Sequence, residues 1–336
     1  MKESRYPAVY VQSNESERNR VIAFKRENDG SLSELGAYDT GGRGDGTPHL
    51  TSQGSVVLTG DGSHLLVTNA GSGDVSVFAV ASDGLSLAGT VATGSAPKSV
   101  AEHDGIVYVL NTGRPSLVGF KLDGFERIGE LALDDGSDPA QVGFAPDGKS
   151  IVVTDRGANA ILQFELDEEG RLGEARRSPS SGPTPYGFVF AGDTLVVTEA
   201  FGAAKGKAAA SSYRLGAGEA TPVSRSVGNG RSEICWAVAT ADGRYAFTTN
   251  FADGAVSRWA VAGDGSIVLE DATAGVAVEG RPGLRDEDLT GDGRFLYAID
   301  ADSRRVFGWA VTNGGTLDPV GSWAELPATA AGLAAS

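Results

Sequence analysis

The chain has 336 residues, of which 40% are hydrophobic and 21% are charged, a balance typical of a globular protein with a substantial core. Its formal net charge of −16 argues against nucleic acid and anionic membrane surfaces as partners, because both would repel it. The single cysteine, Cys235, excludes an intrachain disulfide and a multi-cysteine metal site.

The start of the chain, MKESRYPAVYV, has no apolar stretch of signal-peptide length. No run of about 18 apolar residues, the length that spans a membrane, occurs further along. We therefore expect a cytoplasmic protein. We also expect it to be a monomer or a weak homodimer, and its partner to be a small-molecule substrate.

A short run rich in β-branched and aromatic residues recurs seven times, and a small polar or acidic residue follows each run. In chain order these residues are Asn14, Asn69, Asn111, Asp155, Glu199, Asn250 and Asp300. They are separated by 42 to 55 residues, and one seventh of the chain is 48 residues. Self-similarity at this period indicates a repeat architecture, in which the seven residues would form one ring.

Each repeat contains four short strand-like runs separated by turns rich in Gly, Asp and Ser. Within residues 54–94, Asp61-Gly62 and Asp83-Gly84 mark two hairpins, because such turns need positive φ. Nothing between the repeats has the periodicity of a helix of ten or more residues. The sequence predicts an all-β, seven-bladed β-propeller with four antiparallel strands per blade, forming a single domain over residues 1–336.

Closure of the ring can also be predicted. The first repeat begins at its second strand, AVYVQSN, so its innermost strand is missing from the start of the chain. The tail AELPATAAGLAAS is placed to supply that strand, which would remove an exposed sheet edge.

In a blade, the end of the second strand and the loop leading into the next innermost strand meet on one face. Five such loops carry Pro, at 47–50, 96–100, 138–142, 184–188 and 281–285, and 232–238 is their equivalent without Pro. Together with the strand ends, they bring polar and aromatic groups to one channel mouth, which suits a polar, anionic or oxygen-rich small molecule. The binding candidates are Lys98, Asn69, Asn111, Asp155, Arg156, Trp236, Asn250 and Asp300.

Glu199 is the leading catalytic candidate, as a general base. It lies in VVTEAFGAAKG, where Phe201 and the Gly- and Ala-rich insertion would shield it from solvent. The structural alternative is that Glu199, like Asn69 and Asp155, caps the end of its strand by accepting backbone N–H bonds. His49, in the glycine-rich loop GGRGDGTPHL, is the histidine placed for catalysis, although a structural hydrogen bond would also explain it.

Arg285 and Lys98 are placed either to hold a substrate carboxylate or phosphate or to neutralise the acidic ring. Tyr186 is a candidate proton donor. The segment DLTGDG at 288–293 resembles the start of a calcium loop, but it lacks the downstream bidentate Glu. The sequence therefore predicts metal-independent chemistry without a cofactor.

The motifs DPAQVGFAPDGKSIVVTD, ADGRYAFTTN and GDGRFLYAID resemble those of the lactonase family of seven-bladed propellers. That family includes propeller-type 6-phosphogluconolactonases and the enzyme that lactonizes 3-carboxy-cis,cis-muconate, and the resemblance covers essentially the whole chain. It implies a site with a His, a Glu and Arg residues, of which Glu199 matches the Glu and either Arg285 or Arg281 matches an Arg. The family His is absent from 138–141, and Tyr186 stands where an Arg often follows the Pro.

Three hypotheses follow from these observations. The first is a lactone hydrolase or lactonizing enzyme in which Glu199 is the base, Arg285 and Lys98 hold an anion, and His49 or Tyr186 donates a proton. The second is a non-catalytic propeller that binds a ligand or a protein at the same mouth, because fold does not dictate function. The third is a cycloisomerase or lyase that acts on a natural product at the same site.

Overall fold

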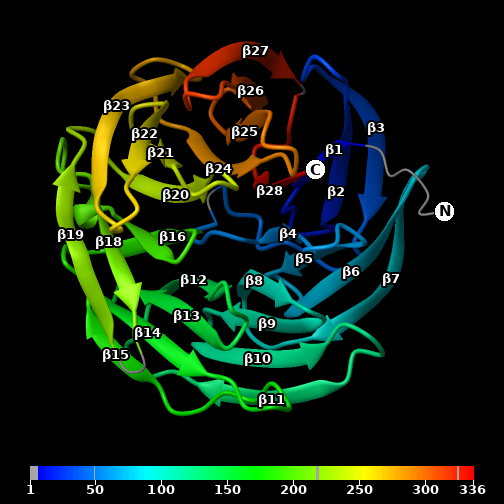
Figure 1. Cartoon of the computed structure of the whole chain (residues 1–336). Helices are drawn as coiled ribbons and strands as arrows, with labels where there is room; N and C mark the ends of the chain where they lie inside the picture. The colour runs from blue at the N-terminus through cyan, green and yellow to red at the C-terminus, as the bar shows by residue number, and fades with distance from the viewer. Residues whose placement is uncertain (1–6, 49, 217–218, 324) are drawn as a thin grey trace.

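The computed structural model describes residues 7–48, 50–216, 219–323 and 325–336. Its strands form seven four-stranded antiparallel sheets, which confirms the predicted seven-bladed propeller. Figure 1 shows the blades arranged in chain order around a central axis, with β28, the innermost strand of the first blade, lying near the centre beside the last blade. In the described part of the chain, no helix has the length and apolar character needed to cross a membrane.

The innermost strands are β28 (Ala331–Ala335), β4 (Val56–Leu58), β8 (Pro97–His103), β12 (Pro139–Phe144), β16 (Pro185–Ala191), β20 (Ile234–Ala239) and β24 (Leu284–Leu289). The second strands are β1 (Ala8–Gln12), β5 (His64–Asn69), β9 (Ile106–Asn111), β13 (Ser150–Asp155), β17 (Thr194–Glu199), β21 (Tyr245–Asn250) and β25 (Phe295–Asp300). The third strands are β2 (Arg20–Arg26), β6 (Asp74–Ala81), β10 (Ser116–Lys121), β14 (Ala160–Glu165), β18 (Ala209–Leu215), β22 (Ala255–Val261) and β26 (Arg305–Val311). The outermost strands are β3 (Leu32–Asp39), β7 (Gly84–Ala92), β11 (Arg127–Ala132), β15 (Arg176–Pro179), β19 (Ala220–Gly228), β23 (Ile267–Val276) and β27 (Leu317–Trp323), and one short 3-10 helix, η1 (Phe201–Ala203), follows β17.

The seven runs that reveal the repeat are the second strands of the blades. Each is buried almost throughout, because a neighbouring blade covers each face of its sheet. In one such contact, Phe247 of β21 packs in a cluster with Leu296 of β25 and Trp309 of β26. Burial on both faces favours a continuous apolar run over alternation, which is why these strands are conspicuous in the sequence.

In three blades, the hairpin between the first two strands is closed by an Asp-Gly turn with the same Thr-to-Asp side-chain bond. Thr240 Oγ1 donates to Asp242 Oδ1 at 2.6 Å, and Thr290 Oγ1 donates to Asp292 Oδ1 at 2.6 Å. The glycine that follows Asp242, Gly243, has φ +68°, a conformation that disfavours any side chain. These turns define the lower face of the molecule, and the ends of the second strands define its upper face.

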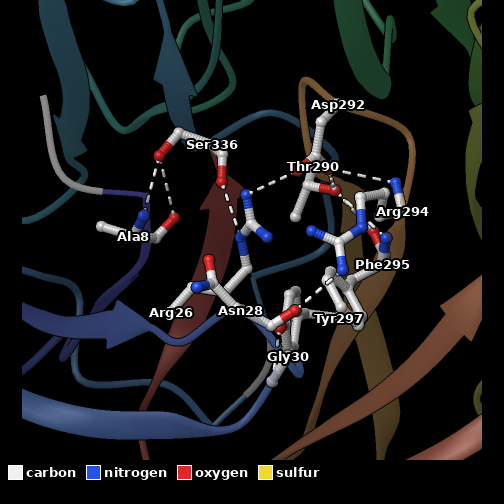
Figure 2. A network of polar contacts seen from close by, with 10 residues as sticks. All are labelled: Ala8, Arg26, Asn28, Gly30, Thr290, Asp292, Arg294, Phe295, Tyr297 and Ser336. Carbon is white, nitrogen blue, oxygen red and sulfur yellow. Dashed lines mark hydrogen bonds and ion pairs between the residues drawn. The ribbon is translucent and has the colours of Figure 1, made fainter. Parts of the chain in front are cut away.

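The ring closes as the sequence predicts, because β28 pairs with β1 in an antiparallel register. Figure 2 shows the contacts that fix the last residue: Ser336 Oγ accepts the Ala8 N–H at 2.8 Å, and Arg26 Nε donates to the Ser336 carbonyl at 3.1 Å. Arg26 also pairs with Asp292 of the last blade at 2.9 Å. One buried guanidinium therefore ties the first blade, the last blade and the closing strand together.

Candidate functional site

A β-bulge recurs near the upper end of the innermost strands. The register shifts between Pro139 and Gln141 in β12, between Ile234 and Ala237 in β20, and between Arg285 and Glu287 in β24. A bulge re-aims the side chain of the extra residue. The residues at these bulges are Lys98, Ala140, Tyr186, Gly187, Cys235, Trp236 and Asp286.

The upper end of the channel is filled by the segment before β4. Ser52 Oγ donates to the Ala140 carbonyl at 2.6 Å, and the Trp236 indole donates to the Ser52 carbonyl at 3.1 Å. Gln53 crosses to the opposite side, where its amide pairs with both the carbonyl (2.8 Å) and the N–H (3.0 Å) of Ala237. The channel mouth expected on this face is therefore occupied by residues of the chain itself.

The sequence analysis predicted that residues 47–50 lead directly into an innermost strand, and this prediction is wrong. The strand β4 begins only at Val56 and is three residues long. The physical reason is that the backbone and side chains of residues 52 and 53 satisfy their hydrogen bonds across the channel rather than along β5. By contrast, Pro97, Pro139 and Pro185 do begin innermost strands, as the Pro pattern predicts.

Beneath this segment, the channel wall holds Tyr186, Arg285 and Asp286, all of them buried. Burial raises the pKa of Asp286 to about 6, although the positive charge of Arg285 and the donors Gly332 N–H and Trp236 indole act in the opposite direction. Burial also raises the pKa of Tyr186 well above its usual value. Two of the four predicted catalytic residues, Tyr186 and Arg285, are therefore brought together with a carboxyl that the sequence analysis did not single out.

The ring of Tyr186 is held by aromatic and cationic neighbours. Its centroid lies 5.7 Å from that of Trp236, and the Arg156 guanidinium lies 5.0 Å from it on its face. Its hydroxyl has no hydrogen-bond partner among the described residues, and the same holds for Asp286 Oδ2. Two polar atoms of the cluster, the Tyr186 hydroxyl oxygen and Asp286 Oδ2, are therefore buried without a hydrogen bond from the described residues.

Two cavities of about 430 and 380 Å³ occupy the lower part of the channel, and they share lining residues that include Gln53, Gln141 and Asp288. We call this space the lower chamber. It extends from Trp236 and Asp286 down to the hairpin glycines Gly291 and Gly293 of the lower face. Its size suits a small molecule.

Three consecutive acidic residues of β24, Asp286, Glu287 and Asp288, are among the residues that line this chamber. Burial raises the pKa of Asp288 to about 7, against the opposing effect of the N–H groups of Ala335 and Leu289, each 2.9 Å from one of its oxygens. Burial raises the pKa of Glu287 well above its usual value, against the opposing effect of the Thr249 N–H. The signal in the sequence was the charged run RDED inside an innermost strand, where apolar residues are expected.

Glu199 has a different environment. Its Oε1 accepts the Gly182 N–H at 2.8 Å and the Ser211 hydroxyl at 2.6 Å, and its Oε2 accepts the Ser226 hydroxyl at 2.7 Å. Ser211 and Ser226 belong to β18 and β19, the outer strands of the blade, so the carboxylate is directed away from the channel. These contacts match the structural alternative, in which Glu199 fixes the end of its strand, and its catalytic role stays a prediction.

The other residues of the strand-end ring make contacts of the same kind. Each is fully buried and is hydrogen-bonded to a nearby loop or to the third strand. These bonds fix the end of each second strand to its neighbours. The bonded pairs are Asn69 with Ser76, Asn111 with Ser116, Asp155 with Ser137, Asn250 with Ser257, and Asp300 with Ser303. Their predicted role in substrate binding is not required to explain their presence.

The remaining candidates lie at the upper rim. Lys98 Nζ pairs with Asp45 Oδ2 at 3.2 Å, and Arg156 pairs with Asp138 at 2.7 Å. The predicted catalytic His49 lies outside the described residues. Among the residues that the structure does describe, no cluster of three or more His, Cys, Asp or Glu side chains is arranged to hold a metal ion.

Known proteins share this architecture. Residues 100–201 match the family model described as lactonase, 7-bladed beta-propeller, while a search of curated proteins found no significant match. A functionally unknown protein from Desulfotomaculum acetoxidans is 14% identical, with a TM-score of 0.77 and 99% of each chain covered. A proposed 6-phosphogluconolactonase from Bacteroides fragilis is 18% identical, with a TM-score of 0.75 over 100% of this chain and 99% of that one.

A periplasmic gluconolactonase from Pseudomonas aeruginosa is 20% identical, with a TM-score of 0.61 over 78% of this chain and 82% of that one. At these identities the solved structures show the fold alone. Together with the match over residues 100–201, they confirm the resemblance drawn from the blade motifs, which is to the lactonase family of seven-bladed β-propellers.

Proposed function

We propose that this propeller is a lactonase-like enzyme that hydrolyses, or in the reverse direction forms, the lactone of a small polar molecule inside the central channel. The family match and the gluconolactonase among the similar structures support this class of reaction. The observation that carries the proposal is Asp286, a buried carboxyl with a raised pKa at the inner end of a chamber of small-molecule size.

In the proposed reaction, ionised Asp286 accepts a proton from water as the water oxygen bonds to the lactone carbonyl carbon. The ring C–O bond then breaks, and the proton passes from Asp286 to the departing ring oxygen, which leaves a hydroxy acid. A base with a pKa of about 6 is largely ionised at neutral pH and still accepts protons effectively. Arg285 and Tyr186, beside Asp286, favour the negative charge that develops on the carbonyl oxygen.

Glu199 is the competing base, as the family resemblance implies. To act, it would have to release at least one of the three donors that occupy its oxygens. Asp286 Oδ2 has no such bond within the described residues. This difference favours Asp286.

The test is hydrolysis of a lactone panel, followed with a pH indicator, by the wild type, Asp286→Asn, Tyr186→Phe and Glu199→Gln. We expect Asp286→Asn to lower kcat by about 10²–10⁴-fold, the usual contribution of a general base. Loss of activity in Glu199→Gln together with its retention in Asp286→Asn would move the base to Glu199. Failure of the wild type on every lactone would refute the proposed activity.

One observation favours a second function. Because Ser52 and Gln53 fill the upper channel, the upper face offers a closed surface, as expected of a propeller that binds a ligand or protein without catalysis. A wild type that hydrolyses no lactone would support this alternative. A cycloisomerase or lyase would use the same Asp286 base, and product analysis would distinguish it from a hydrolase.

A further inference from the structure

A groove of about 670 Å³ opens on the lower face between the fourth blade (β12–β15) and the fifth blade (β16–β19). Its lining comes largely from the β12–β13 hairpin and from the third strands β14 and β18, so it lies to the side of the central channel. We call it the side groove. Phe190 and Leu215 are partly buried apolar residues of its wall, and Lys149 is exposed in it. Its size suits a small molecule.

Two other pairs of blades hold an aromatic ring at the place that corresponds to the side groove. The second strand of the sixth blade begins with Tyr245 and that of the seventh with Phe295, each after an Asp-Gly-Arg turn. The Arg244 guanidinium lies 5.4 Å from the centre of the Tyr245 ring, and the Arg294 guanidinium lies 5.0 Å from that of Phe295. Each ring therefore has a cation on its face from its own turn.

The next blade covers each of these rings with a glycine. Gly315 packs against Tyr245, and Gly30 packs against Phe295, so closely that an added Cβ would clash with the ring. Figure 2 shows Phe295 together with Gly30 and Arg294. The lower part of an interblade gap is thus suited to a planar ring between a cation and backbone.

The fourth blade has the same turn but no ring. Ser150 stands where the other two blades have their aromatic residue, because all three begin the second strand and pair with the sixth residue of the third strand. Lys149 stands where those blades have their arginine. The side chain of a serine is much smaller than a ring, so the space that a ring fills elsewhere remains open in the side groove.

We infer that the side groove binds a small molecule through an aromatic ring, which takes the place that Tyr245 and Phe295 occupy in their own gaps. The ring packs against Phe190 and Leu215, and the Lys149 ammonium approaches its face. The inference concerns a site beside the channel and is independent of the proposed lactonase reaction.

The charges of the side groove favour an uncharged ring. Besides Lys149, its described lining contains one further cation, Arg214, and three carboxylates, Asp147, Glu165 and Asp193. The carboxylates outnumber the cations, so an anionic ring such as benzoate would be repelled, whereas phenol would not.

The experiment is an NMR titration of the isotope-labelled full chain with phenol, cyclohexanol and benzoate, followed through the backbone amides. We expect phenol to shift the amides of Ser150 and Gly216 and to bind at least three-fold more tightly than cyclohexanol, which has a similar size but no π face. Benzoate should bind weakest. Ser150→Phe supplies the ring from the chain itself and should weaken phenol at least ten-fold. Ser86→Phe, on the exposed strand β7, is the matched control and should leave the affinity unchanged.

Cyclohexanol binding as tightly as phenol, or phenol shifts confined to other parts of the chain, would overturn the inference. An unchanged phenol affinity in Ser150→Phe, or equal weakening by the control, would overturn it too. Melting curves show whether Ser150→Phe is folded. If it is not, Lys149→Met, a substitution at an exposed position, decides: we expect it to weaken phenol at least two-fold, and an unchanged affinity would refute the site.

Discussion

Glu199 and Glu287 are both buried carboxyls of the propeller, but their surroundings are opposite. Glu199, at the end of β17, is met by three donors from its own blade. Glu287, in the innermost strand β24, has no hydrogen bond of normal geometry from the described residues. A carboxyl that the fold satisfies stabilises the structure, whereas one that is buried without such bonds lowers stability and has a raised pKa.

The largest effect should come from removing the satisfied carboxyl. Glu199→Ala would leave the Gly182 N–H and two serine hydroxyls buried without an acceptor, and we expect a loss of ~3–5 kcal/mol in the free energy of unfolding. Urea denaturation followed by intrinsic fluorescence measures it, with Asp193→Ala on the exposed β16–β17 hairpin as the control. A loss below ~1 kcal/mol would show that Glu199 is not a structural fastener.

The unsatisfied carboxyls should make stability depend on pH. The pKa of Asp288 is raised from 3.8 to about 7 and that of Asp286 to about 6, so the folded state holds protons that the unfolded state releases. Stability is therefore greatest below pH 4 with respect to these groups and is lost as the pH rises toward 7. Asp288→Asn should remove part of this loss, making the variant ~1–4 kcal/mol less sensitive to a change from pH 4.5 to 8.

The control for that comparison is Asp292→Asn, because Asp292 has a lowered pKa and its substitution should not flatten the same range. Denaturant midpoints at both pH values provide the measurement. Identical pH profiles for the wild type and Asp288→Asn would contradict the raised pKa of Asp288 and weaken the contrast with Glu199.

The segment that fills the upper channel should contribute a smaller amount. Gln53→Ala removes two hydrogen bonds to Ala237 across the channel, and we expect a loss of ~1–3 kcal/mol in unfolding free energy. Gln53→Glu is the matched comparison, since its carboxylate keeps the acceptor for the Ala237 N–H but loses the donor. Hydrogen exchange should show faster exchange of the Ala237 amide in Gln53→Ala, and unchanged exchange would refute the cross-channel contact.

The smallest change in stability should come from Tyr186→Phe. Its hydroxyl has no partner in the described part of the structure, so its removal should alter unfolding free energy by less than ~0.5 kcal/mol. If the hydroxyl assists catalysis, kcat of Tyr186→Phe should nevertheless fall. A lower kcat with an unchanged unfolding free energy would show that the hydroxyl acts in catalysis and not in stability. A large loss of stability would show that the hydroxyl makes a structural hydrogen bond, as Glu199 does.

The seven second strands could be predicted because each is covered on both faces, and this burial leaves an apolar run visible in the chain. The site was less predictable for two reasons. Bulges in the innermost strands re-aim single residues such as Asp286, and no local pattern announces a bulge. The crossing segment at Ser52 and Gln53 depends on partners more than 80 residues away, such as Ala140 and Ala237.

The sequence by itself determined the period, the number of blades and the closing strand, because burial against neighbouring sheets and the geometry of tight turns act locally on residue choice. It also identified Tyr186 and Arg285 as residues of the channel. Only the tertiary structure decided that Glu199 faces outward to Ser211 and Ser226, while Asp286, Glu287 and Asp288 line a chamber. Whether a carboxyl is satisfied depends on donors that other strands bring to it, and those donors are fixed only when the ring has closed.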